Sequence, residues 1–67
     1  MKIDYYHRRL RPVIRHLEQH YAEPIDLHEM ARLAAFSSHH FHRIFKTVTG
    51  ETQAAYLRRL RLETAAR

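Results

Sequence analysis

The stretch from Ser37 to Gly50 constrains the fold more than any other part of the chain. Its apolar side chains recur at the spacing i, i+3, i+4 and i+7, which places them on a single face of a helix. These side chains are Phe41, Ile44, Phe45 and Val48. Ser37 is a favourable N-cap, because its hydroxyl can accept a hydrogen bond from a backbone N–H of the first turn. Gly50 is a favourable C′ residue, because glycine tolerates the left-handed conformation that ends a helix. The sequence therefore predicts a bounded helix over residues 38–48.

The opposite face of this predicted helix is cationic and can form hydrogen bonds. At about 100° per residue, His39, Arg43 and Lys46 point away from the apolar face. His42 lies on the flank, and His40 lies at the edge of the apolar face, where we expect it to be partly buried. A short helix that buries aromatic rings and presents Arg, His and Lys outward has the form of a major-groove reading helix. An ordinary amphipathic surface helix has the same pattern, so the rest of the chain must decide between the two.

Composition favours an all-α domain. The 67 residues contain one Gly and two Pro, which leaves little material for the turns of a sheet, and helix-forming residues are abundant. The sequence has no Cys, which excludes disulfides, thiolate metal sites and cysteine nucleophiles. No apolar run approaches the roughly 18 residues of a membrane helix, and the N-terminus has no signal-peptide core. We therefore expect a cytoplasmic protein with no membrane segment.

The charge is unevenly distributed along the chain. The formal net charge is +5, from 12 Lys and Arg against 7 Asp and Glu. Residues 35–67 hold six basic and two acidic side chains, whereas residues 1–34 are nearly balanced. The excess lies in the half that contains the predicted cationic helix. A basic surface on a small domain indicates a polyanionic partner, most often nucleic acid, although it also serves solubility.

Residues 4–22 predict a first helix, because apolar side chains keep helical spacing through four turns. These side chains are Tyr6, Leu10, Val13, Ile14, Leu17 and Tyr21. Pro12 interrupts the stretch, because it removes a backbone donor and crowds the carbonyl of Arg8. Since the apolar period crosses Pro12 without a slip, we favour one kinked helix, with a new start near Arg11 as the alternative. The arginines of this helix are interpreted as a solvated face.

Asp26 predicts the start of a second helix over residues 27–34, because Glu29 follows it at the capping-box spacing. Four apolar side chains share one face of this helix and are expected in the core. They are Leu27, Met30, Ala31 and Ala34. Only Ala35 and Phe36 separate this helix from the N-cap of the next. Two helices joined by so short a turn form a helix-turn-helix pattern.

Thr52 predicts the start of a fourth helix over residues 53–67. One face of it is assigned to the core and carries Tyr56, Leu57, Leu60 and Thr64. Three other side chains point elsewhere and suggest a second interface, through which the chain would self-associate. They are Leu62, Ala65 and Ala66. The sequence stops inside this helix without a C-cap, so we expect the chain to be the leading part of a longer protein.

Residues along nearly the whole chain resemble those of the AraC/XylS family of bacterial transcription regulators. The first helix-turn-helix of that family is matched by Asp26, Leu27, Met30, Ala31, Ala34, Phe36, Ser37, Phe41, Arg43, Ile44, Phe45, Lys46 and Gly50. The linker helix of the family is matched by Tyr56, Leu57, Leu60, Arg61, Leu62 and Ala65. The resemblance implies an all-α, homeodomain-like helix-turn-helix subdomain of four helices with a long C-terminal linker helix.

One position departs from the family pattern. Ala35 stands in the turn where the family usually has glycine. A left-handed backbone conformation there would cost an alanine about 1 kcal/mol. Either the turn has a slightly different conformation, or the chain tolerates this cost.

The resemblance places the helix over residues 38–48 in the major groove of double-stranded DNA. The base-reading positions of the family correspond to His39, His42 and Arg43. Arg43 is the best candidate for a bidentate contact with guanine O6 and N7, which discriminates by about 1–3 kcal/mol. The two imidazoles can donate to base acceptors, and their protonation near neutral pH would make binding mildly pH-dependent. Contacts with the DNA backbone are assigned to Ser38, Lys46, Thr47, Arg58, Arg59 and Arg61.

The resemblance also implies parts that this chain lacks. The DNA-binding region of the family carries a second helix-turn-helix, and an effector domain lies elsewhere in the full-length protein. RNA polymerase is the implied protein partner of that full-length regulator. Because the chain holds half of the expected contacts, we expect it to bind DNA weakly when isolated.

Other classes of function receive less support. Two histidine pairs have chelating spacing, His16 with His20 and His39 with His42, but a zinc site needs three or four ligands. No third ligand is implied, so we expect no metal and no other cofactor. No nucleophile–base pair or phosphate loop is visible, so we do not expect an enzyme. The main alternative is a helical protein-interaction module that docks through an exposed apolar strip.

Overall fold

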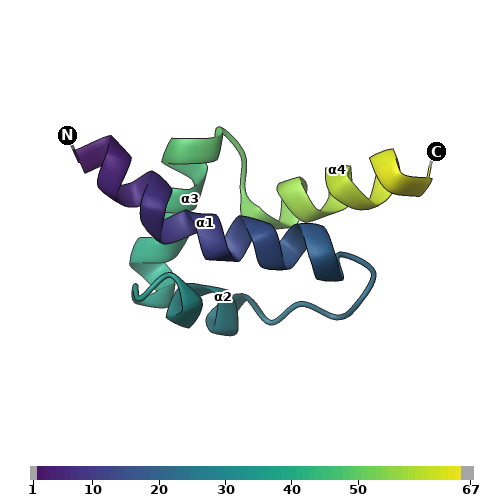
Figure 1. Ribbon diagram of the computed structural model, residues 1–67, viewed down its shortest axis with the longest axis horizontal. Helices are drawn as coiled ribbons and strands as arrows, with labels where there is room; N and C mark the ends of the chain where they lie inside the picture. The colour runs from purple at the N-terminus through teal and green to yellow at the C-terminus, as the bar shows by residue number, and fades with distance from the viewer. Residues whose placement is uncertain (1, 66–67) are drawn as a thin grey trace.

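Four helices account for the regular structure of residues 2–65 in the computed structural model of the chain. They are α1 (Lys2–His20), α2 (Leu27–Leu33), α3 (Ser38–Thr49) and α4 (Gln53–Ala65). Figure 1 shows α2 and α3 packed around α1, with α4 leading away from the end of α3 along the second half of α1. The all-α helix-turn-helix prediction is therefore confirmed.

The helix boundaries agree with the predicted ranges to within two residues over the described part of the chain. The first helix runs without a break across Pro12, so a new start near Arg11 is wrong. It begins and ends two residues earlier than predicted, and α3 continues one residue further, to Thr49. The end of the predicted fourth helix, and with it Ala66, lies outside the described residues.

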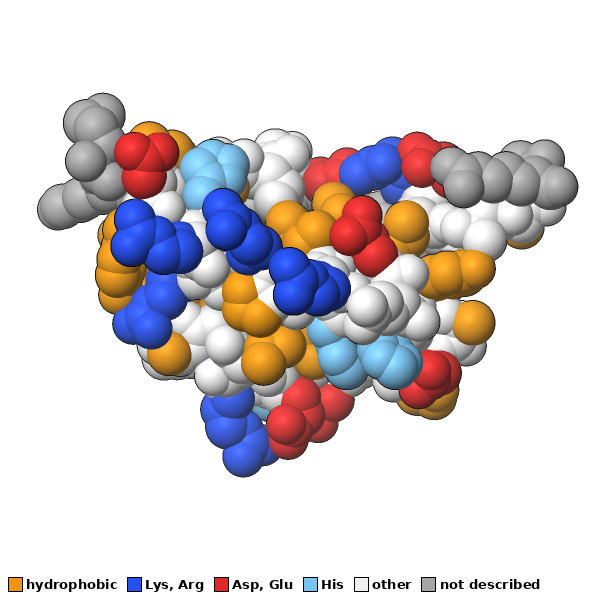
Figure 2. All heavy atoms as spheres, viewed as in Figure 1, with side chains coloured by type: hydrophobic (Ala, Val, Ile, Leu, Met, Phe, Trp, Pro, Cys, Tyr) orange, Lys and Arg blue, Asp and Glu red, His pale blue; other side chains and the backbone are white. Residues whose placement is uncertain are grey.

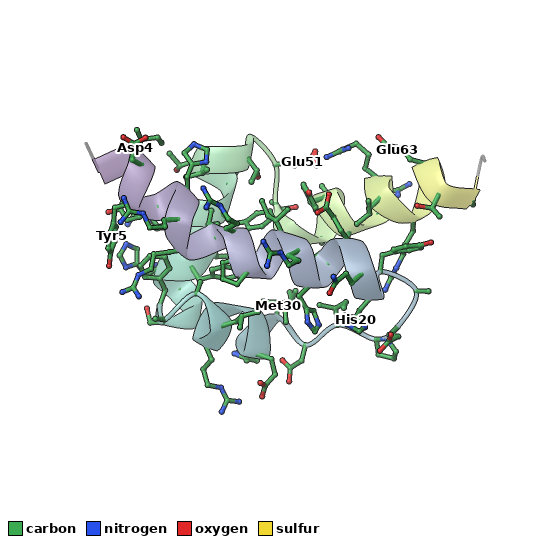
Figure 3. All side chains as sticks on the ribbon, in the orientation of Figure 1. Asp4, Tyr5, His20, Met30, Glu51 and Glu63 are labelled. Atoms are coloured by element: carbon green, nitrogen blue, oxygen red, sulfur yellow. The ribbon has the colours of Figure 1, made fainter. Side chains whose placement is uncertain are left out.

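The core forms where α1, α2 and α3 meet, and α4 adds one buried apolar side chain to it. Its buried apolar members are Leu10, Val13, Leu17, Met30, Ala31, Ala34, Phe41, Phe45 and Leu57. The side chain of Met30 fills the space between α2 and α1 (Figure 3). All nine were expected from helical periodicity. Leu27 was expected as well, and that prediction is wrong: it is 37% exposed, because the first turn of α2 extends beyond the core.

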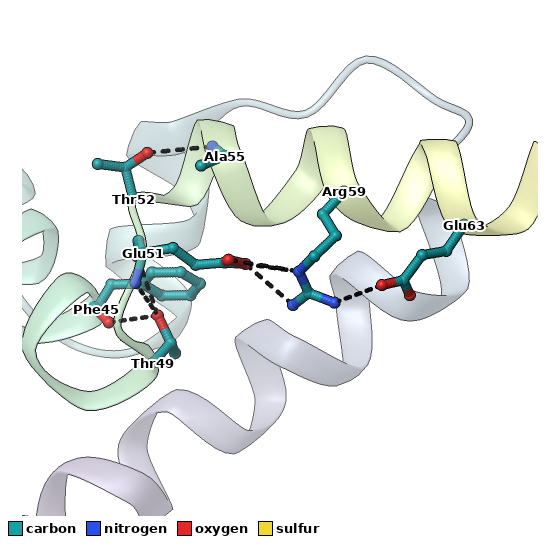
Figure 4. A network of polar contacts seen from close by, with 7 residues as sticks. All are labelled: Phe45, Thr49, Glu51, Thr52, Ala55, Arg59 and Glu63. Atoms are coloured by element: carbon teal, nitrogen blue, oxygen red, sulfur yellow. Dashed lines mark hydrogen bonds and ion pairs between the residues drawn. The ribbon is translucent and has the colours of Figure 1, made fainter.

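Side chains cap the helices at the predicted places. The Asp26 carboxylate accepts a hydrogen bond from the His28 backbone N–H at 2.9 Å, and the Ser37 hydroxyl accepts one from His40 at 3.3 Å. The Thr52 hydroxyl accepts from the Ala55 backbone N–H at 3.1 Å and so caps α4 (Figure 4). The capping box at α2 is incomplete, because the Glu29 side chain is ion-paired with Arg32.

The turn between α2 and α3 contains the left-handed residue that the family pattern implies. Ala35 has φ of 62°, so the chain tolerates the cost of a left-handed alanine. Its N–H donates to the carbonyl of Arg32, and the N–H of Phe36 donates to that of Ala31. This pair of bonds is the Schellman motif, which satisfies the last carbonyls of α2. The motif fixes the angle at which α3 leaves α2.

Candidate nucleic-acid interface

The third helix separates its apolar and cationic side chains onto opposite faces. Phe41 and Phe45 are 1% and 0% exposed and are in contact with each other in the core. His39, Arg43 and Lys46 are exposed on the other face, as the helical wheel predicts. The N-terminal cap and Gly50, with φ of 86°, hold the helix at both ends. The result is a 12-residue helix that stands on aromatic packing and presents a cationic surface.

The cations of this surface are not engaged by the rest of the described chain. Among residues 2–65, neither Arg43 nor Lys46 takes part in an ion pair or a side-chain hydrogen bond. Thr47 is exposed beside them. Their charges and donors therefore remain available to a ligand, which is the condition for a guanidinium to bind a base edge or a phosphate.

The first turn of α3 carries a further polar contact, beside which the surface is hollowed. The Ser38 hydroxyl lies 2.8 Å from Nδ1 of His28, which connects the first turns of α2 and α3. An open hollow of about 300 Å³ lies beside this contact. It is lined by Leu27, His28, Ser38, His39, His42 and Gln53. Three predicted contact residues, two for bases and one for the backbone, thus gather around one depression at the start of α3.

His40 departs from its prediction. It was expected to be partly buried, but its side chain is exposed. Its ring centroid nevertheless lies 5.1 Å from that of Phe36 and 6.4 Å from that of Tyr6. The imidazole therefore covers the edge of an aromatic cluster from the solvent side, because the turn residue Phe36 occupies the position beneath it.

Gln53 is the polar residue that sequence reasoning missed. It is 2% exposed and its Nε2 lies 3.4 Å from Nδ1 of His42, so the first residue of α4 contacts an exposed imidazole of α3. The spacing contained the signal: Gln53 precedes Tyr56 and Leu57 by three and four residues, so it shares their buried face. Its polarity concealed its position in the core.

Tyr56 and Leu57 hold the start of α4 against the rest of the domain. The Tyr56 ring meets Phe45 edge to face, with centroids 5.6 Å apart and planes at 89°. Burial, supported by the carboxylate of Glu18, raises the pKa of the Tyr56 hydroxyl. The contact of Tyr56 with Phe45 packs α3 and α4 into one unit.

The side chains of two arginines of α4, unlike that of Arg43 of α3, have hydrogen-bond partners within residues 2–65. The guanidinium of Arg59 donates to the carboxylate of Glu51 at 3.0 Å and to Glu63 at 2.9 Å, and all three of its nitrogens are engaged (Figure 4). The hydrogen bond to Glu51, followed by the one to Glu63, raises the pKa of Arg59. Arg61 donates to the backbone carbonyls of Tyr21 and Glu23, at 2.6 and 3.2 Å. Both side chains thus have structural partners within the domain.

Arg58 of α4 and three arginines of α1 are also exposed. Arg58 has no ion pair within residues 2–65 and remains available on α4. Arg8, Arg11 and Arg15 lie on the outer side of α1, and Lys and Arg side chains gather over this helix in the view of Figure 2. These α1 side chains face away from the core that α1 shares with α3, which agrees with their interpretation as a solvated face.

No three His, Asp or Glu side chains among residues 2–65 are arranged to hold a metal ion. No helix within the same residues is both long enough and apolar enough to cross a membrane.

The comparisons with known proteins agree with this geometry. The sequence model of the family described as bacterial regulatory helix-turn-helix proteins, AraC family, matches residues 17–58, which is more than half of the chain. The chain belongs to the AraC family. DNA-binding transcription regulation is the function of such proteins, and the matched region contains α2, the turn at Ala35, all of α3 and the start of α4.

Individual relatives are also regulators or DNA-binding proteins by name. The chain is 37% identical over 62 residues to the uncharacterized HTH-type transcriptional regulator YbfP of Bacillus subtilis, covering 92% of this chain and 21% of that protein. It is 39% identical over 57 residues to the right origin-binding protein of Escherichia coli and to the transcriptional regulator Rob of Salmonella typhimurium, covering 85% of this chain and 20% of each. The chain spans about a fifth of the length of these relatives. No solved structure matches it.

The family match includes both helices of the helix-turn-helix. In an AraC-family helix-turn-helix, α2 and α3 are the paired helices, and the exposed face of the second is the surface that the resemblance assigns to DNA. The match does not reach the first 16 residues, so the N-terminal part of α1 is less characteristic of the family than the motif it supports.

Proposed function

We propose that this AraC-family chain binds double-stranded DNA in a sequence-specific manner, with α3 in the major groove. The observation that carries the proposal is the outer face of α3, where exposed cationic and imidazole side chains stand on a helix fixed by buried Phe41 and Phe45. A helix of this width fits the major groove, where every base pair presents a distinct pattern of donors and acceptors.

Base reading is proposed for three side chains of this face. Arg43 forms the bidentate contact with guanine, and His39 and His42 donate to acceptors on neighbouring base pairs. Support comes from the exposure of all three and from the absence of an ion pair for Arg43 within residues 2–65. Lys46 and Thr47, next along the helix, contact phosphates that set its register.

The backbone contacts proposed for the remaining residues are of unequal weight. Ser38 lies at the N-terminus of α3, where backbone N–H groups and the helix dipole favour a phosphate. Arg58 adds an exposed guanidinium. Arg59 and Arg61 would have to exchange their present partners for phosphates. We therefore propose them as secondary contacts, less important than the other four residues.

The wider setting is part of the same proposal. The chain acts in the cytoplasm, within a regulator whose second helix-turn-helix binds the adjacent stretch of groove and whose effector domain lies outside this chain. RNA polymerase is a partner of that full-length protein. None of these roles requires catalysis by the 67 residues.

Selection from a randomised duplex library at low salt tests the proposal. We expect an enriched motif of a few base pairs and, in fluorescence anisotropy, an affinity that falls log-linearly with salt concentration. The Arg43→Ala variant should lose the preference at one position of that motif, whereas Arg11→Ala, with the same change of charge on α1, should keep it.

The rival function makes the opposite prediction for salt. A module that docks through apolar side chains would bind its partner almost independently of salt. The exposed large hydrophobic side chains are spread over three helices, at Ile3, Tyr5, Leu27, Leu33 and Leu62, which supports a single docking strip less well. No enrichment of any duplex, at any salt concentration, would contradict sequence-specific binding.

A further inference from the structure

Gln53 is the buried polar side chain of the described core, and it contacts a proposed base reader. It is 2% exposed, and its Nε2 lies 3.4 Å from Nδ1 of His42. Its Oε1 is buried and has no hydrogen-bond partner. A buried amide without partners is destabilising, so the contact with His42 offsets part of the cost of placing a glutamine here.

This contact constrains the proton on the imidazole of His42. When the Nε2–H of Gln53 donates to Nδ1, that nitrogen must be unprotonated, and the neutral ring carries its proton on Nε2. In this arrangement Nδ1 faces Gln53, and Nε2 on the far side of the ring bears the proton.

We propose that Gln53 is a positioning residue that makes His42 a hydrogen-bond donor toward the DNA. The inference deepens the proposed function and rests on it. With an Nε2–H directed outward, His42 can donate to the acceptor groups of the major groove, namely guanine N7 and O6, adenine N7 and thymine O4. It disfavours cytosine, which presents the N4 amino donor at that edge. Gln53 thereby influences which base pair His42 reads without touching the DNA.

The surroundings of His42 supply an internal control. The other titratable side chains that line the adjacent hollow are His28 and His39, and Arg43 and Lys46 follow on the same helix. His28 is bound through Nδ1 to Ser38. His39 is exposed and has no side-chain hydrogen bond within residues 2–65, so it reports the behaviour of an imidazole on the same helix without a glutamine partner.

Nuclear magnetic resonance of the free protein tests the positioning directly. Long-range proton–nitrogen correlation of histidine-labelled protein should show Nδ1 of His42 as the unprotonated nitrogen at neutral pH. In Gln53→Met, which keeps the length of the side chain but cannot donate, His42 should exchange between tautomers as His39 does. In Gln53→Glu, the carboxylate can only accept, so Nδ1 of His42 should become protonated.

The second variant keeps the test decisive if the first unfolds, and His39 should be unchanged in each. Protonation of Nδ1 in the wild-type chain, or the same protonation of Nδ1 in all folded variants, would overturn the proposal.

A DNA arm separates this inference from the proposed function. On the duplex enriched by selection, Gln53→Met should lose discrimination by about three- to tenfold at the base pair opposite His42. Discrimination at the Arg43 position should persist. If the resonance data hold and no duplex is enriched, the proposed function fails while the positioning stands. If a duplex is bound and its specificity is the same in wild type and Gln53→Met, Gln53 has no role in reading.

Discussion

Two sets of basic side chains lie within one small domain, and they differ in what holds them. On α3, Arg43 and Lys46 extend from the surface without an ion pair among residues 2–65. On α4, Arg59 is bound by two carboxylates and Arg61 by two backbone carbonyls. A guanidinium whose donors are already satisfied must give up those bonds before it can bind a phosphate. Availability of donors, rather than positive charge alone, therefore separates the proposed reading surface from a helix that serves the fold.

The largest effect should come from the reading surface. Replacing Arg43 with Ala removes a bidentate contact, so we expect about a 10- to 100-fold loss of discrimination at one base pair. Thermal unfolding should be nearly unchanged, because the side chain is exposed and supports no other group. Anisotropy titrations of the enriched duplex and of single-base variants measure the effect. A uniform loss over all sequences would assign Arg43 to phosphate contacts instead.

The next effect should fall mainly on stability, because Arg61 is proposed only as a secondary contact with DNA. Arg61→Ala removes two hydrogen bonds that attach α4 to the segment after α1, so the free energy of unfolding should fall by about 1–2 kcal/mol. The melting temperature should drop by about 4–8 °C per kcal/mol. Arg58→Ala, on the same helix, is the matched control. Equal melting temperatures for both variants would mean that the Arg61 bonds contribute nothing.

A smaller effect is expected for Lys46→Ala. The loss of one phosphate contact should weaken binding to all duplexes by a similar factor and reduce the slope of log affinity against log salt by about one. Discrimination among sequences should stay as in the wild type, in contrast to Arg43→Ala. A change of sequence preference would move Lys46 from positioning to reading.

The smallest effect is expected for Arg59→Ala. Because Glu51 and Glu63 hold this guanidinium, its removal should leave DNA affinity and its salt dependence almost unchanged. Surface ion pairs contribute little, so stability should change only slightly as well. Paired titrations of Arg59→Ala and Arg58→Ala make the contrast visible. A loss of affinity as large as that of Lys46→Ala would show that the side chain leaves its carboxylates on binding DNA.

Periodicity and caps were enough to predict the fold. The apolar spacing in the four helices located the whole buried apolar core, and Asp26, Ser37 and Thr52 marked helix starts that the structure has. These features are local, so a single sequence contains them. Leu27 failed because the wheel places a residue on a face but does not say how far the core extends along the helix axis.

The polar partners could be predicted only in part. The cationic face of α3 followed from the helical wheel, because exposure is the complement of burial on one helix. The contact of Arg59 with Glu63 has the i,i+4 spacing of a helix, but that of Arg59 with Glu51 crosses a turn and that of Arg61 with Tyr21 crosses about forty positions of the chain. No spacing rule connects the last two pairs. Helical periodicity places Gln53 at a core position, but a polar amide is usually expected at the surface. The sequence thus predicted the exposed cationic face of α3, but it did not predict that Arg59 and Arg61 have hydrogen-bond partners within the domain.

The left-handed Ala35 has a consequence for the life of the protein in a cell. A cost of about 1 kcal/mol multiplies the unfolded fraction of a small domain roughly fivefold. Proteases act on that open fraction when the chain opens and closes faster than it is cut. The dihedral angle of one turn residue therefore helps to set the lifetime of the folded chain, and a glycine there would lengthen that lifetime without altering the exposed face of α3.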